Sequence, residues 1–507
     1  TTLLYGDLMA KLNKSWDDFS LNAAIGTSIT DTRTSALRLD SKTASLYYPN
    51  VFTIANINMS SSAYIEESDD ARRQMQSFFA MAQLGYKESL YLDVTARNDW
   101  SSTLAFTERK SRGFFYPSVG LSWIIPKSFS MPSLISFGKV RASWSKVGND
   151  IPLFVSNTVG HIAAGGIPQP NDTAPFGTLK PEMSSSFEIG TEWKFFDYRM
   201  DVDLTFYKTN TKNQLFSLPS SAGAAYKYYF VNAGNIQNMG VELTLGAVPI
   251  LTNQFKWNTT LNFSRNKNEV KKLHDDLASF IQGDEGFSSS YTMRLVEGGS
   301  FGDIYGKAFE RDKYGAIVYG RDGLPQEIGS GNTAKVGNCN PAFLLGWGNS
   351  FTYKDFSFYF LIDGHFGGDV LAQTQAVLDQ TGVSKVSGET RTMGYVDLEG
   401  HHIYNIKGFY EQVGGRNGVT EYYMYDATNI RLRELSLGYT LPKRLLGRKQ
   451  FVKKAELSFV ARNLFFIYKK APFDPDAVLS ASNSNQGIDI FGIPTTRSVG
   501  FNVKLSF

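Results

Sequence analysis

The sequence predicts an all-β fold, namely an antiparallel transmembrane β-barrel with long extracellular loops. Two observations lead to this prediction. About fifteen segments alternate apolar and polar residues, which is the period of a strand whose two faces meet different surroundings. The connections between these segments alternate between short and long along the chain, as in outer-membrane barrels with short turns on one side and long loops on the other.

A soluble β-sandwich is the main alternative to a barrel. Its strands also alternate, but its loops have no physical reason to sort by length onto one end. Barrels, in addition, carry girdles of aromatic residues where strands leave the membrane. Aromatic residues stand at such strand ends at Trp123, Phe195, Phe196, Trp257 and Tyr353. We therefore expect the apolar faces of the strands to contact the lipid bilayer.

Composition excludes several other classes of protein. The chain has 507 residues, of which 42% are hydrophobic and 14% aromatic, and a formal net charge of +3. Nucleic-acid-binding domains are usually strongly basic, so no nucleic-acid partner is expected. The apolar content excludes a disordered chain, and the single Cys339 excludes a disulfide scaffold. Apolar runs such as Phe358–Ile362 are far shorter than the roughly 20 residues of a membrane-spanning helix.

The alternation is clearest at the C-terminus. One face of this segment carries Val499, Phe501, Val503, Leu505 and Phe507. The same pattern at 90–97 places Arg97 on the polar face. An arginine facing lipid at mid-membrane costs about 2–4 kcal/mol, so the polar faces are expected to surround an aqueous lumen.

The predicted connections fall into three length classes, between strands of about ten residues each. The short ones lie at 15–18, 87–88, 196–198, 251–254 and 354–355. Those of intermediate length lie at 126–136 and 442–453. The long ones lie at 30–72, 99–112, 148–182, 213–236, 271–340, 364–427 and 464–495.

Several phrases resemble the barrel of SusC-like TonB-dependent transporters, and they follow in the same order along the whole chain. These phrases are Arg97–Leu104, Phe115–Trp123, Val140–Asn149, Asn235–Leu243, Gly337–Pro341, Asn429–Tyr439, Ala461–Phe465 and Phe473–Asp476. The resemblance implies a bacterial outer-membrane barrel of about 22 strands whose lumen holds a plug. Residues 1–507 are then expected to be the C-terminal portion of that barrel, with the plug and the N-terminal strands absent from this chain.

The resemblance also implies a function and its partners. It implies TonB-dependent nutrient uptake, with an oligosaccharide or an oligopeptide as the substrate. A SusD-like surface lipoprotein would act as the lid over the extracellular mouth. The TonB complex would act through the missing N-terminal region, and a dimer of transporter–lipoprotein pairs is a further expectation. Two alternatives stay open: a passive outer-membrane porin, and a barrel-anchored interaction protein.

Substrate contacts are expected in the long loops, because binding residues often lie on irregular segments held by a rigid scaffold. Flat aromatic rings in these loops can stack on sugar faces or on peptide side chains. The alternative is that they pack loop against loop, or against the lid protein. The candidate residues are Tyr226, Tyr228, Phe230, Tyr422, Tyr423 and Tyr425.

Two further groups of residues have expected structural roles. Charged residues facing the lumen are expected to pair with one another or with a plug, namely Arg97, Arg141, Asp363, Glu456 and Arg462. The resemblance implies that the C-terminal apolar residues belong to the signal read by the outer-membrane assembly machinery. These residues are Phe501, Val503, Leu505 and Phe507.

The residues do not suggest an enzyme, a metal site or a cofactor. His401 and His402 are adjacent in a long loop, without further ligands at spacings that would converge on a metal. Cys339 has no evident base beside it, which argues against a reactive thiol. The glycine-rich segments Gly298–Gly302 and Gly414–Gly418 are interpreted as turns, and neither is expected to be a nucleophile elbow or a phosphate-binding loop.

Overall fold

The computed structural model describes most of the chain, which divides into two compact units. The described residues are 1–40, 44–58, 64–107, 113–156, 158–163, 167–169, 171–174, 179–220, 223–274, 277–281, 290–328, 334–446, 451–478 and 485–507. Unit 1 comprises Thr1–Ser130, Lys139–Ile189 and Lys208–Ile236. Unit 2 comprises Met131–Gly138, Gly190–Tyr207 and Gln237–Phe507.

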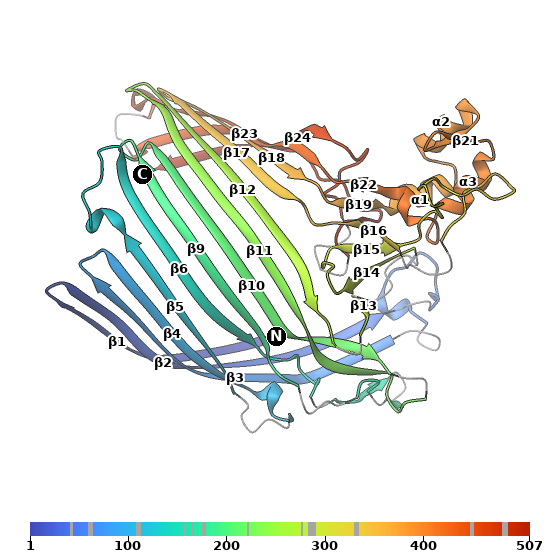
Figure 1. Cartoon of the computed structure of the whole chain (residues 1–507), viewed down its shortest axis with the longest axis horizontal. Helices are drawn as coiled ribbons and strands as arrows, with labels where there is room; N and C mark the ends of the chain where they lie inside the picture. Colours follow the sequence, from blue (N-terminus) through green and yellow to red (C-terminus); the bar gives the residue numbers. More distant parts are fainter. Residues whose placement is uncertain are drawn as a thin grey trace. The chain divides into compact units, whose positions relative to one another are not determined.

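Among the described residues, 15 strands form one sheet in which they follow one another in chain order (Figure 1). They are β1 (Thr2–Trp16), β2 (Phe19–Asp40), β3 (Tyr64–Tyr86), β4 (Leu90–Ser101), β5 (Gly113–Ile124), β6 (Ile135–Asn149), β9 (Glu182–Phe195), β10 (Met200–Pro219), β11 (Tyr228–Leu251), β12 (Phe255–Lys272), β17 (Phe343–Tyr353), β18 (Phe356–Phe366), β23 (Asn429–Thr440), β24 (Lys454–Lys469) and β26 (Ser498–Ser506). The meander and the number of strands confirm the sequence-based prediction.

Tight turns join the strands at all five places where the sequence predicts them. β1 ends at Trp16 and β2 begins at Phe19, for example, while β17 ends at Tyr353 and β18 begins at Phe356. Four of these turns contain non-glycine residues with a left-handed backbone, including Asp17 with φ 34°. Because successive connections of a meander lie at opposite ends of the strands, the short connections share one end and the long connections share the other.

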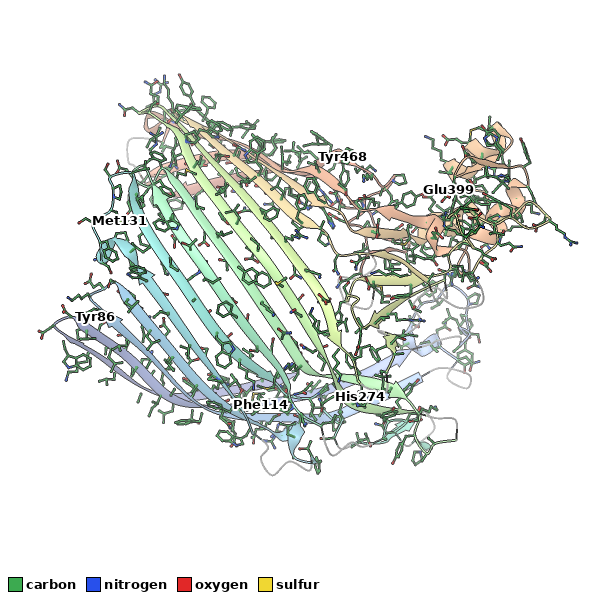
Figure 2. All side chains as sticks on the ribbon, viewed as in Figure 1. Tyr86, Phe114, Met131, His274, Glu399 and Tyr468 are labelled. Carbon is green, nitrogen blue, oxygen red and sulfur yellow. The ribbon has the colours of Figure 1, made fainter. Side chains whose placement is uncertain are left out.

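In the strands of unit 1, apolar side chains are exposed and polar side chains are buried, which is the reverse of the pattern in a soluble protein. On one face, large apolar side chains are exposed, among them Leu8 and Ile25. On the other face, Ser28 pairs with Ser77, and Ser77 pairs with Asp99, and all three are buried. Exposed apolar patches of this kind mark a surface that contacts a partner or a membrane. Figure 2 shows the side chains that project from the strands.

Unit 1 also has a small apolar cluster at the end of the strands that carries the long connections. Leu104, Phe114, Ile151, Val155 and Leu179 are buried together there, and Phe114 is labelled in Figure 2. The cluster joins residues from the connections after β4, β6 and β8 (Ile167–Gln169) to β5. The long connections of unit 1 are therefore anchored by apolar packing and not only by the strands that they join.

The long connections contain short elements of their own. The strands are β7 (His161–Ala163), β8 (Ile167–Gln169), β13 (Ser279–Ile281), β14 (Tyr291–Val296), β15 (Asp303–Gly306), β16 (Ala334–Asn338), β19 (Asp369–Ala372), β20 (Val396–Leu398), β21 (His401–Ile403), β22 (Met424–Asp426) and β25 (Ile488–Asp489). The helices are α1 (Gln373–Gln380), α2 (Lys385–Met393) and α3 (Ile406–Val413), with short 3-10 turns at Ile54–Asn56, Ser102–Leu104, Ile125–Lys127, Thr420–Tyr423 and Lys443–Leu445. No helix in the described part of the chain has the length and apolar character needed to cross a membrane.

In unit 2 the long connections fold around a core of their own. Leu371 of β19, Ala376 of α1, Phe409 of α3 and Ile488 of β25 belong to one buried cluster. Side chains cap the N-termini of α2 and α3: at α2 the Ser384 hydroxyl accepts a hydrogen bond from the Ser387 amide at 3.0 Å, which satisfies a free N–H group of the helix. These loops therefore form a packed body.

Two details of the sequence-based prediction are wrong. The strands reach 24 residues in β11, well beyond the expected length of about ten. Residues 213–236, predicted as a long loop, belong mostly to the extended ends of β10 and β11. Polar residues such as Asn210 and Asn235 hide the strand period in this segment, but they bond to each other across the hairpin at 2.9 Å.

Candidate functional site

A pocket of about 480 Å³ opens on the polar face of unit 2. Strand pairing places its lining residues on that face. Gly346 of β17 lies between Asn262 of β12 and Asp363 of β18, and Asp363 pairs in turn with Arg431 of β23. Residues that lie directly opposite one another in a sheet project from the same face. The pocket is therefore part of the wall formed by consecutive strands.

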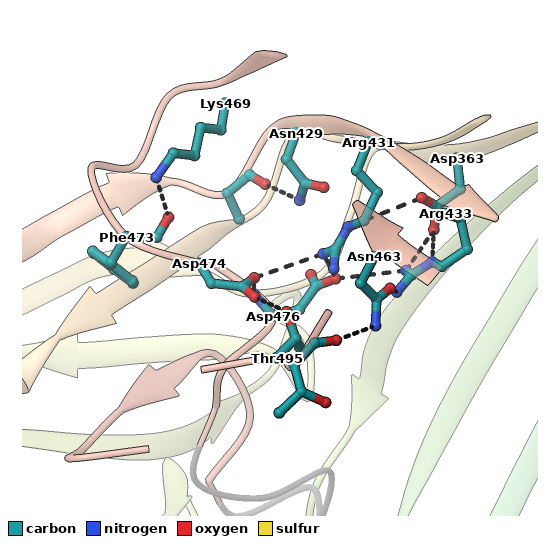
Figure 3. A network of polar contacts seen from close by, with 12 residues as sticks. Asp363, Asn429, Arg431, Arg433, Asn463, Lys469, Phe473, Asp474, Asp476 and Thr495 are labelled. Carbon is teal, nitrogen blue, oxygen red and sulfur yellow. Dashed lines mark hydrogen bonds and ion pairs between the residues drawn. The ribbon is translucent and has the colours of Figure 1, made fainter. Parts of the chain in front are cut away.

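A β-bulge in β23 directs Arg433 into this pocket. Arg433 is not paired with a residue of either neighbouring strand. Leu432 before it and Glu434 after it each pair with β18 and with β24, so the pairing skips Arg433. Such a bulge turns a side chain out of the regular alternation. The Arg433 guanidinium donates from Nε to Asp363 Oδ2 at 2.9 Å and from Nη1 to Asn463 Oδ1 at 3.1 Å (Figure 3).

Arg431 is the most deeply buried charge of this network, with a side chain that is only 2% exposed. Its Nη2 atom forms an ion pair with Asp476 and lies 3.7 Å from Asp474 Oδ1. Its guanidinium also lies over the Phe466 ring, 4.6 Å from the ring centroid. A buried arginine is stable only with such partners, because removing a charge from water is costly.

The loop after β24 brings both carboxylates to Arg431. Lys469 donates to the backbone carbonyls of Pro472 at 2.9 Å and Phe473 at 3.2 Å, which curls the chain back. The Asp476 amide then donates to Asp474 Oδ1 at 3.1 Å, and the Thr495 hydroxyl donates to the other oxygen of Asp474. Figure 3 shows this loop beside β23. The charge network thus ties a long connection to the wall.

The first aromatic cluster is only partly exposed. Tyr226 and Tyr228 are exposed at the hairpin between β10 and β11. Beside them, Lys227 forms an ion pair with Asp172 at 2.8 Å. Phe230 packs against the apolar cluster of unit 1 that contains Leu104. Tyr226 and Tyr228 thus remain accessible to a ligand, while Phe230 supports the hairpin.

The second aromatic cluster lies in the core of the loops. Tyr423 is only 1% exposed, so other residues of the loops cover its ring, and its contact with substrate stays a prediction. Its ring packs edge-on against Tyr422 with centroids 5.0 Å apart, and both belong to or contact the loop core. Burial raises the pKa of Tyr422 and of Tyr423 well above the usual range of tyrosine. Tyr425 packs at the same core against Phe473. Substrate contact by Tyr422 and Tyr425 stays a prediction.

The five predicted lumen charges lie on the strands, four of them with partners outside the predicted set. Arg97 donates to Asp99 at 2.7 Å, and Arg462 donates to Glu434 at 3.0 Å. Glu456 accepts from Lys454 at 3.2 Å, and Asp363 accepts from Arg433. Arg141 lies on β6 opposite Ser122. The pairs are mostly between neighbours on the same or the next strand.

The four apolar C-terminal residues are all exposed on one face. Phe501 is 85% exposed, and Val503, Leu505 and Phe507 are also exposed. Phe501 pairs with Phe459 of β24, and their rings meet edge-on at 5.6 Å. This exposed apolar row fits a lipid-facing surface, while the role of the row in barrel assembly stays a prediction.

Sequence reasoning missed Arg431, Arg433, Asp474 and Asp476 as a site. Their signal was present: two arginines stand two residues apart in a strand, and two aspartates flank Pro475 in a loop. Their meeting depends on the bulge and on the fold of a loop, which no local pattern encodes. Within the described ranges, no group of three or more His, Cys, Asp or Glu residues is arranged to hold a metal ion.

The fold agrees with the comparisons with known proteins. Residues 2–323 match the family described as "TonB dependent receptor-like, beta-barrel". TonB-dependent receptor P3 of Formosa agariphila is 26% identical over 489 residues, which cover 88% of this chain and 47% of that receptor. TonB-dependent receptor SusC of Bacteroides thetaiotaomicron is 22% identical over 491 residues, which cover 88% of this chain and 46% of SusC. The chain spans about half the length of these curated relatives.

Solved structures show the same fold. The RagAB peptide importer in its open-open state superposes with a TM-score of 0.75 at 18% identity, covering 99% of this chain and 54% of that one. The outer membrane transporter YddB from Escherichia coli superposes with a TM-score of 0.53 at 10% identity, covering 100% of this chain and 54% of that one. The chain therefore belongs to the TonB-dependent receptor β-barrel family, which places it in the bacterial outer membrane.

Proposed function

We propose that the protein containing this chain imports an oligosaccharide or an oligopeptide across the outer membrane, driven by TonB. A SusD-like surface lipoprotein would cover the extracellular mouth, and two such pairs would associate as a dimer. This chain supplies strands of the barrel wall and the long extracellular loops. A peptide as the cargo has support in the name of one fold neighbour, the RagAB peptide importer.

Two observations support the proposal: a charged pocket lies on the polar face of the wall, and the long connections form a body with its own core. Polar faces of outer-membrane barrels line the lumen, through which cargo passes. A loop body built around buried residues such as Phe409 and Tyr423 can present one defined surface to a lid protein. Neither feature is needed by a wall that only encloses water.

The residues singled out by the sequence have roles in this proposal. Tyr226 and Tyr228 would contact cargo or lid at the loop side, because their rings are exposed. The charge pairs of Arg97, Arg462 and Asp363 would hold the wall, and Arg141 and Glu456 would join them on the lumen side. The exposed row ending in Phe507 would serve as the assembly signal.

An uptake experiment tests the proposal against a passive porin. Bacteria that carry the whole gene would receive labelled oligopeptides or oligosaccharides, with TonB intact or deleted. We expect uptake to be lost when either the gene or TonB is deleted. Uptake that persists without TonB but still depends on the gene would identify a passive channel instead.

The partner is tested separately by purification in mild detergent. We expect a surface lipoprotein to copurify with the intact protein and to remain bound through size exclusion. A protein that purifies without any lipoprotein, and whose deletion reduces cell adhesion without reducing uptake, would favour the barrel-anchored interaction protein.

A further inference from the structure

An apolar groove of about 350 Å³ lies on the face of unit 2 opposite to the charged pocket. Phe358 of β18 pairs with Leu437 of β23, and Leu437 pairs with Phe459 of β24, which pairs in turn with the exposed Phe501. Directly paired residues project from the same face of a sheet. The groove is therefore open to the surroundings of the exposed apolar row of β26. Its lining includes Tyr353, Phe356, Phe358, Leu437, Tyr439 and Leu457.

Aromatic pairs hold the walls of the apolar groove in place. The rings of Phe351 and Phe358 stack with centroids 5.9 Å apart, and the ring of Phe356 lies 4.7 Å from that of Tyr439. The groove stays open despite these contacts, because Phe356 is 60% exposed. Its volume is within the range of sites that bind small ligands, about 300–1,000 Å³. A preformed, concave and exposed apolar surface of this kind is suited to binding an apolar chain.

The apolar groove lies at the end of the strands that carries the short connections. Tyr353 ends β17 and Phe356 begins β18, with only Lys354 and Asp355 between them. The short turns of outer-membrane barrels face the periplasm, and aromatic residues near them lie at the level of the lipid headgroups. The groove is therefore placed to contact acyl chains, while the turn beside it is placed to contact headgroups.

Positive charge surrounds this end of the groove. The Lys354 ammonium lies 5.4 Å from the centroid of the Tyr353 ring. The Thr440 amide donates to the Asp355 carbonyl at 2.8 Å, so the connection after β23 begins beside this turn. In the turn and in the described part of that connection, 441–446 and 451–453, Asp355 is the single acidic residue. The basic residues of that connection are Lys443, Arg444 and Lys453. Such a surplus of cations attracts an anionic headgroup.

The same connection has exposed apolar side chains beside its basic residues. Leu445 is 64% exposed and Phe451 is 76% exposed. The Phe451 ring packs against Phe507 of the C-terminal apolar row, with centroids 5.1 Å apart. Exposed apolar residues next to lysine and arginine are typical of segments that lie in the interface of a membrane with anionic lipids. This composition identifies a lipid, and not a soluble anion, as the ligand.

We propose that the apolar groove binds a phospholipid with an anionic headgroup. One acyl chain lies in the groove against Phe356 and Leu437, and its burial supplies the apolar part of the affinity. Lys354 binds the headgroup phosphate while its aliphatic stem follows the apolar surface. Arg444 and Lys453 add positive charge at the level of the headgroup. The inference concerns the contact of the wall with its membrane, and it does not depend on the proposed import function.

Lipid binding to the whole purified protein in detergent tests the inference. The probes are phosphatidylglycerol and phosphatidylcholine with identical acyl chains, and native mass spectrometry counts the bound lipids. We expect phosphatidylglycerol to bind about tenfold more tightly, because its headgroup lacks the cation that offsets the phosphate of phosphatidylcholine. Soluble glycerol phosphate at the same concentration should not compete. Equal affinities of the two lipids, or competition by glycerol phosphate, would overturn the inference.

Two variants of the groove have matched controls. Lys354→Gln should reduce the preference for phosphatidylglycerol about fivefold. Lys87→Gln should not, because Lys87 lies over a tyrosine ring in a short turn of unit 1, 5.3 Å from the Tyr86 centroid, outside the groove. Leu437→Trp should fill the groove and abolish the binding of both lipids. Val499→Trp, at an exposed residue on the same face of β26, should bind lipid normally. Equal losses in variants and controls would contradict the inference.

A protein surface is the competing occupant of the apolar groove. Size exclusion should show the same oligomeric state for the unmodified protein and for Leu437→Trp. An assembly that Leu437→Trp dissociates would place a second copy or another protein in the groove, and this outcome would overturn the inference. Heat-modifiable migration shows whether each variant keeps its barrel. The comparison of the two lipids on the unmodified protein decides the question without any variant.

Discussion

Arg431 on β23 and Asp476, which follows it by 45 residues, form an ion pair although the arginine side chain is almost completely buried. The pair joins a strand of the wall to the loop after β24. Asp474 and Asp363 lie near the same guanidinium at 3.7 and 4.0 Å, so no single carboxylate balances the buried positive charge alone. Loop position and wall stability are therefore coupled through one side chain.

Replacing Asp476 with Asn should lower the free energy of unfolding by about 2 kcal/mol. This is less than the loss of a sole partner would cost, because Asp474 and Asp363 remain. Thermal unfolding in detergent measures the change. Asp172→Asn is the control, since its exposed pair with Lys227 is screened by solvent and should contribute much less to stability. Equal losses for both variants would contradict the buried role of Asp476.

Replacing Arg311 with Lys should loosen the loop core while keeping the charge. Arg311 binds both carboxylate oxygens of Glu399, at 2.9 and 2.7 Å, and reaches Glu421 at 2.8 Å, a fork that lysine cannot reproduce. The Phe309 amide donates to Glu421 at 2.8 Å. We expect its hydrogen exchange to become faster, by a factor that corresponds to a loss of about 1 kcal/mol of protection. Lys407→Ala, in an exposed pair with Glu411, should leave this amide unchanged.

The loop core should become less stable as pH rises from about 4 towards neutral. Asp379 is fully buried, and burial raises its pKa above 3.8 although the Ser384 hydroxyl donates to it. The folded state therefore binds the proton more tightly than the unfolded state, and stability falls as pH passes from 3.8 to the raised pKa. Asp379→Asn should weaken this dependence, as measured by proteolysis of the loops at several pH values.

Glu399→Gln is the opposite control for the pH experiment. Arg311 lowers the pKa of Glu399, so this carboxylate stabilises the fold above its ordinary pKa and loses that effect as pH falls. The Gln variant should therefore lose more resistance to proteolysis at neutral pH than at acid pH. The same pH profile in both variants would show that neither carboxylate is responsible.

Cys339 should react slowly with alkylating reagents. Burial raises the pKa of its thiol to about 11, from an ordinary value of 9.0. The reactive thiolate should then be about 100-fold scarcer at pH 8 than in an unfolded chain. Iodoacetamide modification followed by mass spectrometry, with the denatured protein as reference, measures this ratio. Equal rates in both states would show that the thiol is not shielded.

Replacing Phe501 with Arg should impair insertion into the outer membrane. Phe501 lies in the middle of β26 on the exposed apolar face, where an arginine costs about 2–4 kcal/mol against lipid. Asn502→Arg places the same charge on the opposite face and should be tolerated. The amount of heat-modifiable barrel in outer-membrane fractions reports the difference. Equal insertion of both variants would contradict a lipid-facing Phe501.

The sequence predicts the wall of this protein better than its loops, for a physical reason. Strand faces obey a period of two, so the exposure of Phe501 follows from the alternation alone. Turn positions such as 87–88 can be predicted because the alternation of the strand before them ends there and that of the next strand begins. These features are local, and the membrane imposes them on every strand in the same way.

The loop residues obey no such period. Tyr423 stands in a run of aromatic residues that suits an exposed binding surface, yet it is buried in a core shared with Phe409 and Ile488. The meeting of Arg433 with Asp363 depends on a bulge, and that of Arg431 with Asp476 depends on a distant loop. Such contacts arise from tertiary packing, which no short window of sequence contains.

The stem formed by β19 and β22 also makes the intervening segment exchangeable. Leu371 pairs with Met424, so the excursion through α1, α2 and α3 leaves and returns at neighbouring backbone positions. A segment whose two ends are adjacent can be transferred to another protein without distorting the backbone on either side of it. Residues 373–423 thus form one segment that chimeras between relatives could exchange while the strands of the large sheet stay unchanged.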